Sequence, residues 1–199
     1  NQLSGQAQQI TSFLPEDFAN YHKAKNVYTK DTAKAKELLQ EAGVSGPIKT
    51  TLYTTDHTWI TQLAPQIKND LAESGIDVDI QSMKSSALYP SITDKDDADF
   101  SMVLAPGDPS VFGDDPDLLM NWWYGDNVWT KQRTFWNGSE SYNELHDLMN
   151  KALAAKTDDE RQDYWNQCYD LLSEQVPLYP LFHRKVSTAV KKGVFSEYK

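Results

Sequence analysis

The sequence predicts an α/β fold in which a mixed, mainly parallel sheet is flanked by helices. Three observations predict it. A strand–helix–strand pattern within residues 48–80 has the length of a βαβ unit, whose crossover makes the two strands parallel. A third strand follows at 100–104, and two long amphipathic helices follow after 140. With 199 residues, the chain is expected to form a single compact lobe, 1–199.

The first elements are marked by periodicity and by glycine. A helix is expected to begin at Asp31 and to end at Gly43, because glycine readily adopts the left-handed conformation that ends helices. Its apolar positions repeat at helical spacing: Ala35, Leu38, Leu39 and Ala42. The β-branched run 48–54 predicts a strand. Residues 1–27 precede this pattern and are expected to be an entry segment near a hinge, with the α/β core at 28–190.

The next helix and strand complete the βαβ unit. An apolar stripe over 60–71 predicts a helix that ends near Gly75, in which Pro65 should cause a kink or mark the true start. Alternation of apolar and polar residues over 76–80 predicts the second strand. The third strand, 100–104, runs into the tripeptide 105–107.

The stretch 105–141 is unusually long, aromatic and acidic for a connection. It contains four of the six tryptophans: Trp122, Trp123, Trp129 and Trp136. Part of it is predicted to be helical, because Asp115 can cap a turn with Pro116 at its first position. Connections longer than about 12 to 15 residues are usually functional or disordered, and so many aromatic residues argue against disorder.

The C-terminal part predicts two helices and an extended segment. The first helix carries an apolar stripe over 142–152. The second opens with Thr157 and Glu160, a capping pair, and is expected to bury Trp165, Cys168, Leu171 and Leu172. Residues 176–182 are predicted to be extended at a sheet edge, because Pro177 and Pro180 cannot donate ladder hydrogen bonds.

Composition argues against several functional classes. The net charge of −10 would repel nucleic acid and anionic membrane surfaces unless a strong basic patch compensated, and Lys191 and Lys192 are only a pair. Cys168 is the only cysteine and is expected to be an inert buried thiol. The acidic runs 94–99 and 114–117 lack the spacing of a calcium loop, so a solvated acidic surface is expected. No metal, cofactor or catalytic residue is predicted, since phosphate-loop, dinucleotide and nucleophile-elbow motifs are absent.

Candidate binding residues gather where strands are predicted to end. Asp108 follows the third strand, at the edge where open α/β sheets place ligand crevices, and its carboxylate could hold a ligand ammonium. The alternative is that Asp108 only starts a turn before Pro109. Thr55 and His57 follow the first strand and could face the same crevice. The tryptophans could stack on ligand, or they could pack in the core.

Two sequence segments carry a family resemblance. The first is residues 33–43, which a predicted strand follows at residue 48, and the second is residues 71–80. With the strand 99–108 and the segment 177–182, they resemble the oligopeptide- and dipeptide-binding proteins of ABC importers, family 5 extracellular solute-binding proteins, in the order of their second lobe. The resemblance implies the C-terminal lobe of a two-lobed, type II periplasmic-binding-protein-like fold that closes over ligand. The sequence departs from the family pattern at Ala105, where members often have tryptophan, and in the insertion-like stretch 109–117.

The resemblance implies a function and a set of site residues. Asp108 matches the aspartate that holds the terminal ammonium of bound peptides in many members. The expected ligand-binding residues are Asp108, Gly107, Phe112, Trp122, Trp123, Trp129, Thr55 and His57. Expected partners are a peptide or other small solute, the N-terminal lobe of the same protein and the membrane subunits of an ABC importer, with no nucleic acid and a monomeric state. The expected location is the extracellular face of the bacterial membrane, with a lipid anchor, or the periplasm.

Two other functions stay open at this stage. An oligosaccharide receptor of the same family would also use tryptophans, which stack on sugar rings. A hydrolase using carboxylates of the central stretch belongs to a different class, and Asp114 and Asp117 are its candidate residues.

Overall fold

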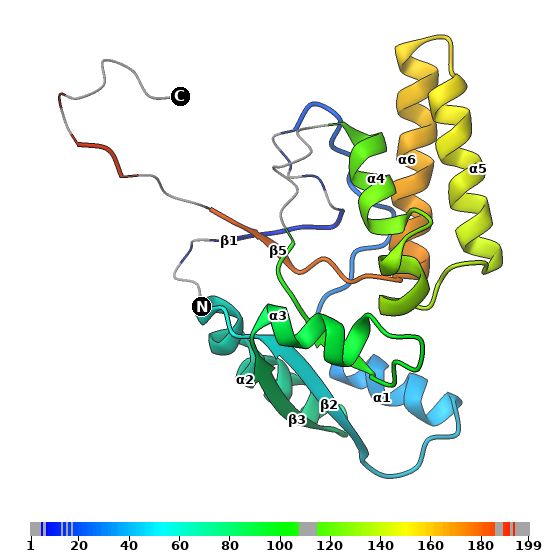
Figure 1. Ribbon diagram of the computed structural model, residues 1–199. Coiled ribbons are helices and arrows are strands. Elements are labelled where there is room, and N and C mark those ends of the chain that lie inside the picture. Colours follow the sequence, from blue (N-terminus) through cyan, green and yellow to red (C-terminus); the bar gives the residue numbers. More distant parts are fainter. Residues whose placement is uncertain are drawn as a thin grey trace.

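The computed structural model describes residues 5, 7–12, 14, 16, 18–107, 115–185, 189–191 and 193. Within them the chain forms an α/β half, a helical half and a small antiparallel strand pair (Figure 1). Two separate hydrophobic clusters stabilise the two halves, and they share no residue.

The α/β half contains a three-stranded parallel sheet. Its strands are β2 (Ile48–Thr55), β3 (Ile76–Met83) and β4 (Met102–Leu104), in the order β3-β2-β4. Ile48 pairs with Ile76, and Leu52 pairs with Met102. Helix α2 (Thr58–Glu73) connects β2 to β3, and α1 (Thr32–Glu41) precedes β2. The predicted βαβ unit and the third parallel strand are therefore confirmed.

The sheet and α2 share an apolar core because their apolar residues face one another. Leu52 and Val78 on the strands and Ile60 and Ala64 on the helix are almost completely buried. Gly75 has a φ of +89°, a conformation that side chains other than glycine disfavour, and it turns the chain from α2 into β3. Two short helical segments, α3 (Ser85–Leu88) and η1 (Tyr89–Thr93), lie between β3 and β4.

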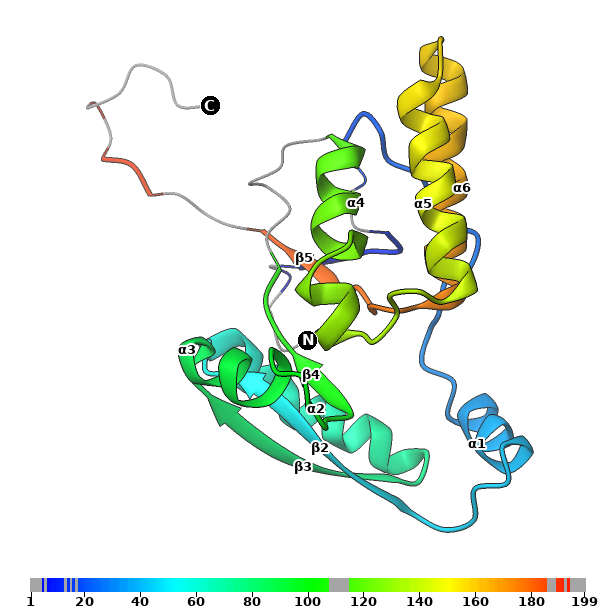
Figure 2. The ribbon, with the colours of Figure 1, turned by 45° about the vertical axis from the view of Figure 1, so that its right-hand side comes forward.

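The helical half consists of α4 (Pro116–Tyr124), η3 (Trp129–Arg133), α5 (Glu140–Ala154) and α6 (Asp158–Gln175). Helices α5 and α6 lie side by side as an antiparallel hairpin, well away from the sheet (Figure 2). Leu145 and Met149 of α5 and Trp165 and Cys168 of α6 are buried between them and α4.

The helix starts agree with the caps expected from the sequence. Asp115 caps α4 by accepting a hydrogen bond from the Asp117 backbone N–H at 2.9 Å. Thr157 caps α6 through the Glu160 N–H at 3.2 Å, but the Glu160 carboxylate accepts from the Lys156 N–H rather than from that of Thr157. Of the two hydrogen bonds expected for the capping pair, only the one from the Glu160 N–H to the Thr157 hydroxyl is present.

The strands β1 (Ala7–Gln9) and β5 (Phe182–Arg184) pair antiparallel, with Ala7 opposite Arg184. Segments from near the two ends of the chain therefore lie side by side beneath α4 (Figure 1). The extended prediction for 176–182 holds only at its end, since regular strand begins at Phe182.

Two features of α1 and α2 qualify the sequence predictions, and three short helical turns were not predicted. Pro65 lies inside α2, which begins seven residues earlier at Thr58, so Pro65 does not mark the start of the helix. The apolar stripe of α1 is not a buried face, because no residue of α1 is buried and Leu38 is 53% exposed. The helical turns α3, η1 and η3 were not predicted, because segments this short contain no full apolar period.

Candidate functional site

A cavity of about 530 Å³ lies where the α/β half, the helical half and β5 meet. This volume is within the range of about 300 to 1,000 Å³ that is typical of ligand pockets. Its lining includes Leu52 of β2, the residues 100–107, which run along β4 and past its carboxyl end, and the residues 182–184 of β5. The cavity therefore follows the edge strand β4 and reaches its carboxyl end, the side of the sheet where open α/β folds bind ligands.

The chain leaving β4 packs closely on α4. Gly107 has no side chain, and a methyl group added there would lie 2.7 Å from Cη2 of Trp123. Real carbon atoms do not approach this closely without displacement, so glycine is required for the observed packing. Trp123 in turn is 7% exposed and belongs to the core of the helical half. This contact joins the end of the sheet to α4.

Trp129 forms the neighbouring part of the cavity wall. Its ring lies 4.5 Å from that of Trp123 at an interplanar angle of 61°, an edge-to-face arrangement that aromatic pairs favour. Together the two indoles give the helical side of the cavity a broad apolar surface.

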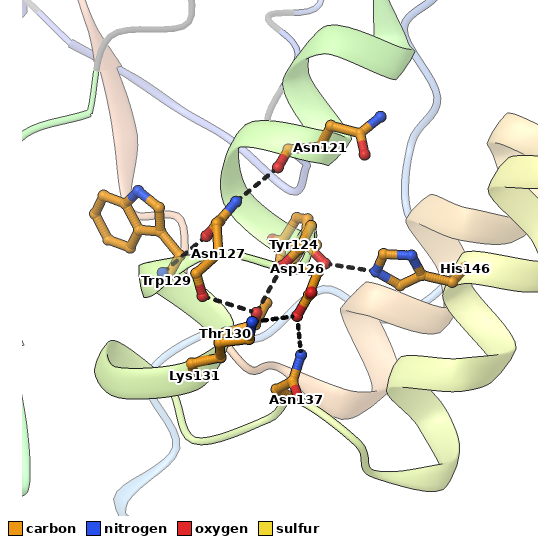
Figure 3. Close-up of polar contacts among 10 residues, drawn as sticks. Asn121, Tyr124, Asp126, Asn127, Trp129, Thr130, Lys131, Asn137 and His146 are labelled. Atoms are coloured by element: carbon orange, nitrogen blue, oxygen red, sulfur yellow. Dashed lines mark hydrogen bonds and ion pairs between the residues drawn. The ribbon is translucent and has the colours of Figure 1, made fainter. Parts of the chain in front are cut away.

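A network of hydrogen bonds fixes the turn that carries Trp129 (Figure 3). The Asn127 side chain donates to the carbonyl oxygens of Asn121 at 2.8 Å and Trp122 at 3.0 Å, and its own oxygen accepts from the Trp129 N–H at 2.8 Å. The Thr130 hydroxyl donates to the Gly125 carbonyl at 2.6 Å. The Asn127 side chain thus donates to backbone carbonyl groups at the end of α4 and accepts from the backbone N–H of the first residue of η3.

A second set of contacts holds the same turn from outside. Asp126 accepts from Asn137 at 2.9 Å and pairs with Lys131 at 2.8 Å, and Lys131 lowers the pKa of Asp126 (Figure 3). His146 Nε2 lies 2.9 Å from the Tyr124 carbonyl, which can only accept, so this nitrogen carries a proton. The turn is therefore preorganised before any ligand arrives.

Arg133 joins the two halves of the chain across the cavity. Its Nε and Nη2 donate to the two carboxylate oxygens of Asp94, each at 2.7 Å. Its guanidinium group lies 4.2 Å from the ring centre of Tyr89 and 4.3 Å from that of Trp129. The hydrogen bonds from Arg133 hold the pKa of Asp94 below its usual range. We call this group of four side chains the Arg133 clamp.

The clamp corrects one sequence prediction. Asp94 was expected to belong to a solvated acidic surface, but its side chain is only 25% exposed and is bound to Arg133. Its neighbour Asp97 is 88% exposed, as expected. The run therefore mixes one structural carboxylate with solvated ones.

The opposite wall of the cavity is formed by α2 and β5. Trp59 and Phe182 make an edge-to-face pair with ring centres 5.8 Å apart, and the Arg184 guanidinium lies 4.7 Å from the ring centre of Trp59. All three residues line the cavity. This wall combines an aromatic platform with a positive charge.

The residues predicted for the site are placed as follows. Gly107, Trp123 and Trp129 line the cavity, whereas Trp122 is 49% exposed and is not part of its lining. Thr55 is fully buried, and its hydroxyl oxygen lies 3.1 Å from Nδ1 of His57 just before α2, outside the cavity lining. Asp108 and Phe112 lie outside the described residues, so their predicted contacts stay predictions.

The cavity residues that were not singled out from the sequence include Tyr89, Arg133 and Arg184. No local motif marks the contacts of Arg133 with Asp94 and Tyr89, because Asp94 lies 39 residues from Arg133 and Tyr89 lies still farther away in sequence. Arg184 could have been noticed as one of only three arginines in an acidic chain, close to the predicted extended segment.

The described residues contain no group of three or more side chains suited to holding a metal ion, and no helix among them is long and apolar enough to cross a membrane. Cys168 is fully buried, as expected, and burial raises the pKa of its thiol to about 12.

Comparison with known proteins gives a consistent result. The family described as bacterial extracellular solute-binding proteins, family 5 Middle, matches residues 1–131. The glutathione-binding protein GsiB of Escherichia coli (strain K12) is 22% identical over 194 residues, which cover 96% of this chain and 37% of GsiB. The chain thus spans little more than a third of the length of the curated relatives it matches.

Solved structures show the same fold. The ABC transporter substrate-binding protein CtaP from Listeria monocytogenes matches with a TM-score of 0.74 and 24% identity, over 89% of this chain and 35% of that one. The dipeptide-binding protein from Pseudoalteromonas sp. SM9913, solved with Met-Leu, matches with a TM-score of 0.70 and 23% identity, over 92% and 36%. The matches confirm the α/β class and the periplasmic-binding-protein fold, and they group the chain with solute-binding proteins rather than with enzymes.

Proposed function

Because this chain belongs to the bacterial extracellular solute-binding proteins of family 5, we propose that it is one lobe of a substrate-binding protein that delivers peptides or peptide-like solutes to an ABC importer. In this proposal residues 1–27 are the hinge-proximal segment, 28–190 are the α/β core, and 105–141 supply much of the ligand wall. The partners are the N-terminal lobe of the same protein and the membrane subunits of the importer.

The observation that carries the proposal is the position of the cavity. It combines an aromatic wall at Trp123 and Trp129, the carboxyl end of β4 and the strand β5. The β1–β5 pair places the residues 7–9 beside the residues 182–184, which line the cavity. Closure of a second lobe over this cavity would exclude water and strengthen each polar contact with ligand.

The names of the relatives support a peptide-like ligand. One group of relatives is named for binding glutathione, and a structural neighbour was solved with the dipeptide Met-Leu. In the proposal, Asp108 holds the ligand ammonium close to Gly107, and Phe112 extends the apolar wall. Thr55, His57 and Trp122 do not line the cavity and are given no ligand contact in this proposal.

The location follows from the same proposal. A receptor of this kind works in the periplasm or at the extracellular face of the bacterial membrane, where a lipid anchor on the full-length protein would keep it close to the importer. Extraction of the full-length protein with detergent, compared with extraction with salt, tests the anchor.

Native mass spectrometry of the full-length protein tests the proposed function. A two-lobed peptide receptor is expected to retain small peptides through purification, and these should appear as a series of discrete added masses. Trp129→Ala should reduce the retained fraction, because it removes most of one cavity wall. Leu153→Ala is the matched control, since Leu153 is 56% exposed on α5 and does not line the cavity. Retention of sugars, or of nothing, would contradict the peptide assignment.

A further inference from the structure

The charged side chains in the described part of the cavity lining have one sign. Among the residues that the structure describes, the lining contains Arg133 and Arg184 but neither aspartate nor glutamate. The whole chain carries 29 acidic and 19 basic residues, so the described part of the cavity wall differs in charge from the average of the chain.

The charge of Arg133 is already compensated. Asp94 occupies its Nε and Nη2 donors, and its guanidinium also lies over the rings of Tyr89 and Trp129. Arg133 therefore holds the two halves of the chain together and is not the group that attracts an anion.

Arg184 is in a different situation. Of the three arginines, Arg133 and Arg161 pair with aspartates, whereas Arg184 has no carboxylate partner among the described residues. Its guanidinium stacks over Trp59 at 4.7 Å, and Trp59 is braced by Phe182. Stacking uses the flat face of the guanidinium and leaves the N–H donors at its edge available for bidentate binding of a carboxylate.

We propose that Arg184, stacked on Trp59, is the anchor for a ligand carboxylate, and that the substrate class is peptides or peptide-like solutes with a free carboxylate. This inference rests on the proposed function and deepens it. The carboxylate end of the ligand lies at β5, and its apolar part lies against Trp129 across the cavity.

The test uses the full-length protein and two matched probes, the tripeptide Ala-Ala-Ala and the same tripeptide with a C-terminal amide. Calorimetric titration is expected to show that amidation weakens binding by about 10- to 100-fold, the range for a charge-assisted hydrogen bond. In Arg184→Gln the free tripeptide should weaken by a similar factor, and the effect of amidation should almost disappear. Arg161→Gln is the control, because Arg161 is the surface arginine of α6 paired with Asp158.

The outcomes separate the inference from the proposed function. If both tripeptides bind the unmodified protein equally well, Arg184 is not a carboxylate anchor, but peptide binding stands. The same conclusion follows if Arg184→Gln weakens both tripeptides equally, as expected if Arg184 pairs with an acid of the other lobe. If neither tripeptide binds, the peptide-binding function fails, and the inference fails with it. Melting temperatures of both variants within about 2 °C of the unmodified protein show that folding is intact.

Discussion

The Arg133 clamp gives the sharpest prediction for stability, because it joins two halves whose hydrophobic clusters are separate. The perturbation is a double-mutant cycle of Asp94→Asn and Arg133→Met. The side chains of Arg133 and Asp94 are 15% and 25% exposed, so water replaces their mutual hydrogen bonds only in part. Each single variant leaves one partner poorly satisfied.

The expected magnitude follows from these contacts. Hydrogen bonds to charged groups contribute about 1.5 to 3 kcal/mol, and exposed ion pairs contribute only about 0.2 to 1 kcal/mol. For a pair that is mostly shielded, we expect each single variant to lower the free energy of unfolding by about 2 to 3 kcal/mol. For a chain of this length that lowers the melting temperature by about 4 to 12 °C. The coupling energy between the two positions should be about 2 kcal/mol.

The assay is urea unfolding followed by circular dichroism, at pH 7 and across the acid range. Arg133 lowers the folded-state pKa of Asp94, so the stabilisation is complete above the ordinary carboxyl pKa near 4 and disappears as the pH falls through the lowered value. The difference between unmodified protein and Asp94→Asn should therefore shrink below about pH 4. Arg161→Met, which breaks an exposed pair with Asp158, should cost less than about 1 kcal/mol. A coupling energy of zero between positions 94 and 133 would refute the clamp.

Three further predictions concern the cavity wall and the core. Gly107→Ala should displace Trp123, since the new methyl group would lie 2.7 Å from its ring, and overpacking should cost about 1 to 3 kcal/mol with a changed near-ultraviolet circular dichroism spectrum. Asn127→Ala should lower the free energy of unfolding by about 1 to 2 kcal/mol, because it removes the side-chain hydrogen bonds that hold the start of η3. The fraction of protein that retains ligand in native mass spectrometry should also fall. Cys168 should resist iodoacetamide in the folded chain and react only after unfolding, because burial raises the pKa of its thiol to about 12; rapid alkylation of folded protein would contradict its placement.

Much of the fold was predictable because its signals are local. The caps at Asp115 and Thr157 and the glycine turns at Gly43 and Gly75 act through neighbouring residues. Alternation and helical spacing then define the strands and helices between these positions. The parallel sheet followed from the length of the βαβ unit and the handedness of its crossover.

The site was less predictable because its contacts are not local. Sequence reasoning named Trp123 and Trp129 from their aromatic character, the family resemblance named Gly107, and all three line the cavity. It could not identify Arg133, whose partner Asp94 lies 39 residues away and looks like one of several surface acids. Nor could it tell exposed Trp122 from buried Trp123, since adjacent residues of a helix differ in environment only after packing is known.

The most direct test of the two-lobed account is calorimetric titration of Ala-Ala-Ala into the full-length protein and into the 199-residue chain alone. The account predicts clear binding by the full-length protein and binding by the chain alone that is at least about 100-fold weaker, a difference of about 2.7 kcal/mol. This is because one lobe supplies only part of the contacts and leaves the cavity open to water. Equal, micromolar binding by the chain alone would contradict the account.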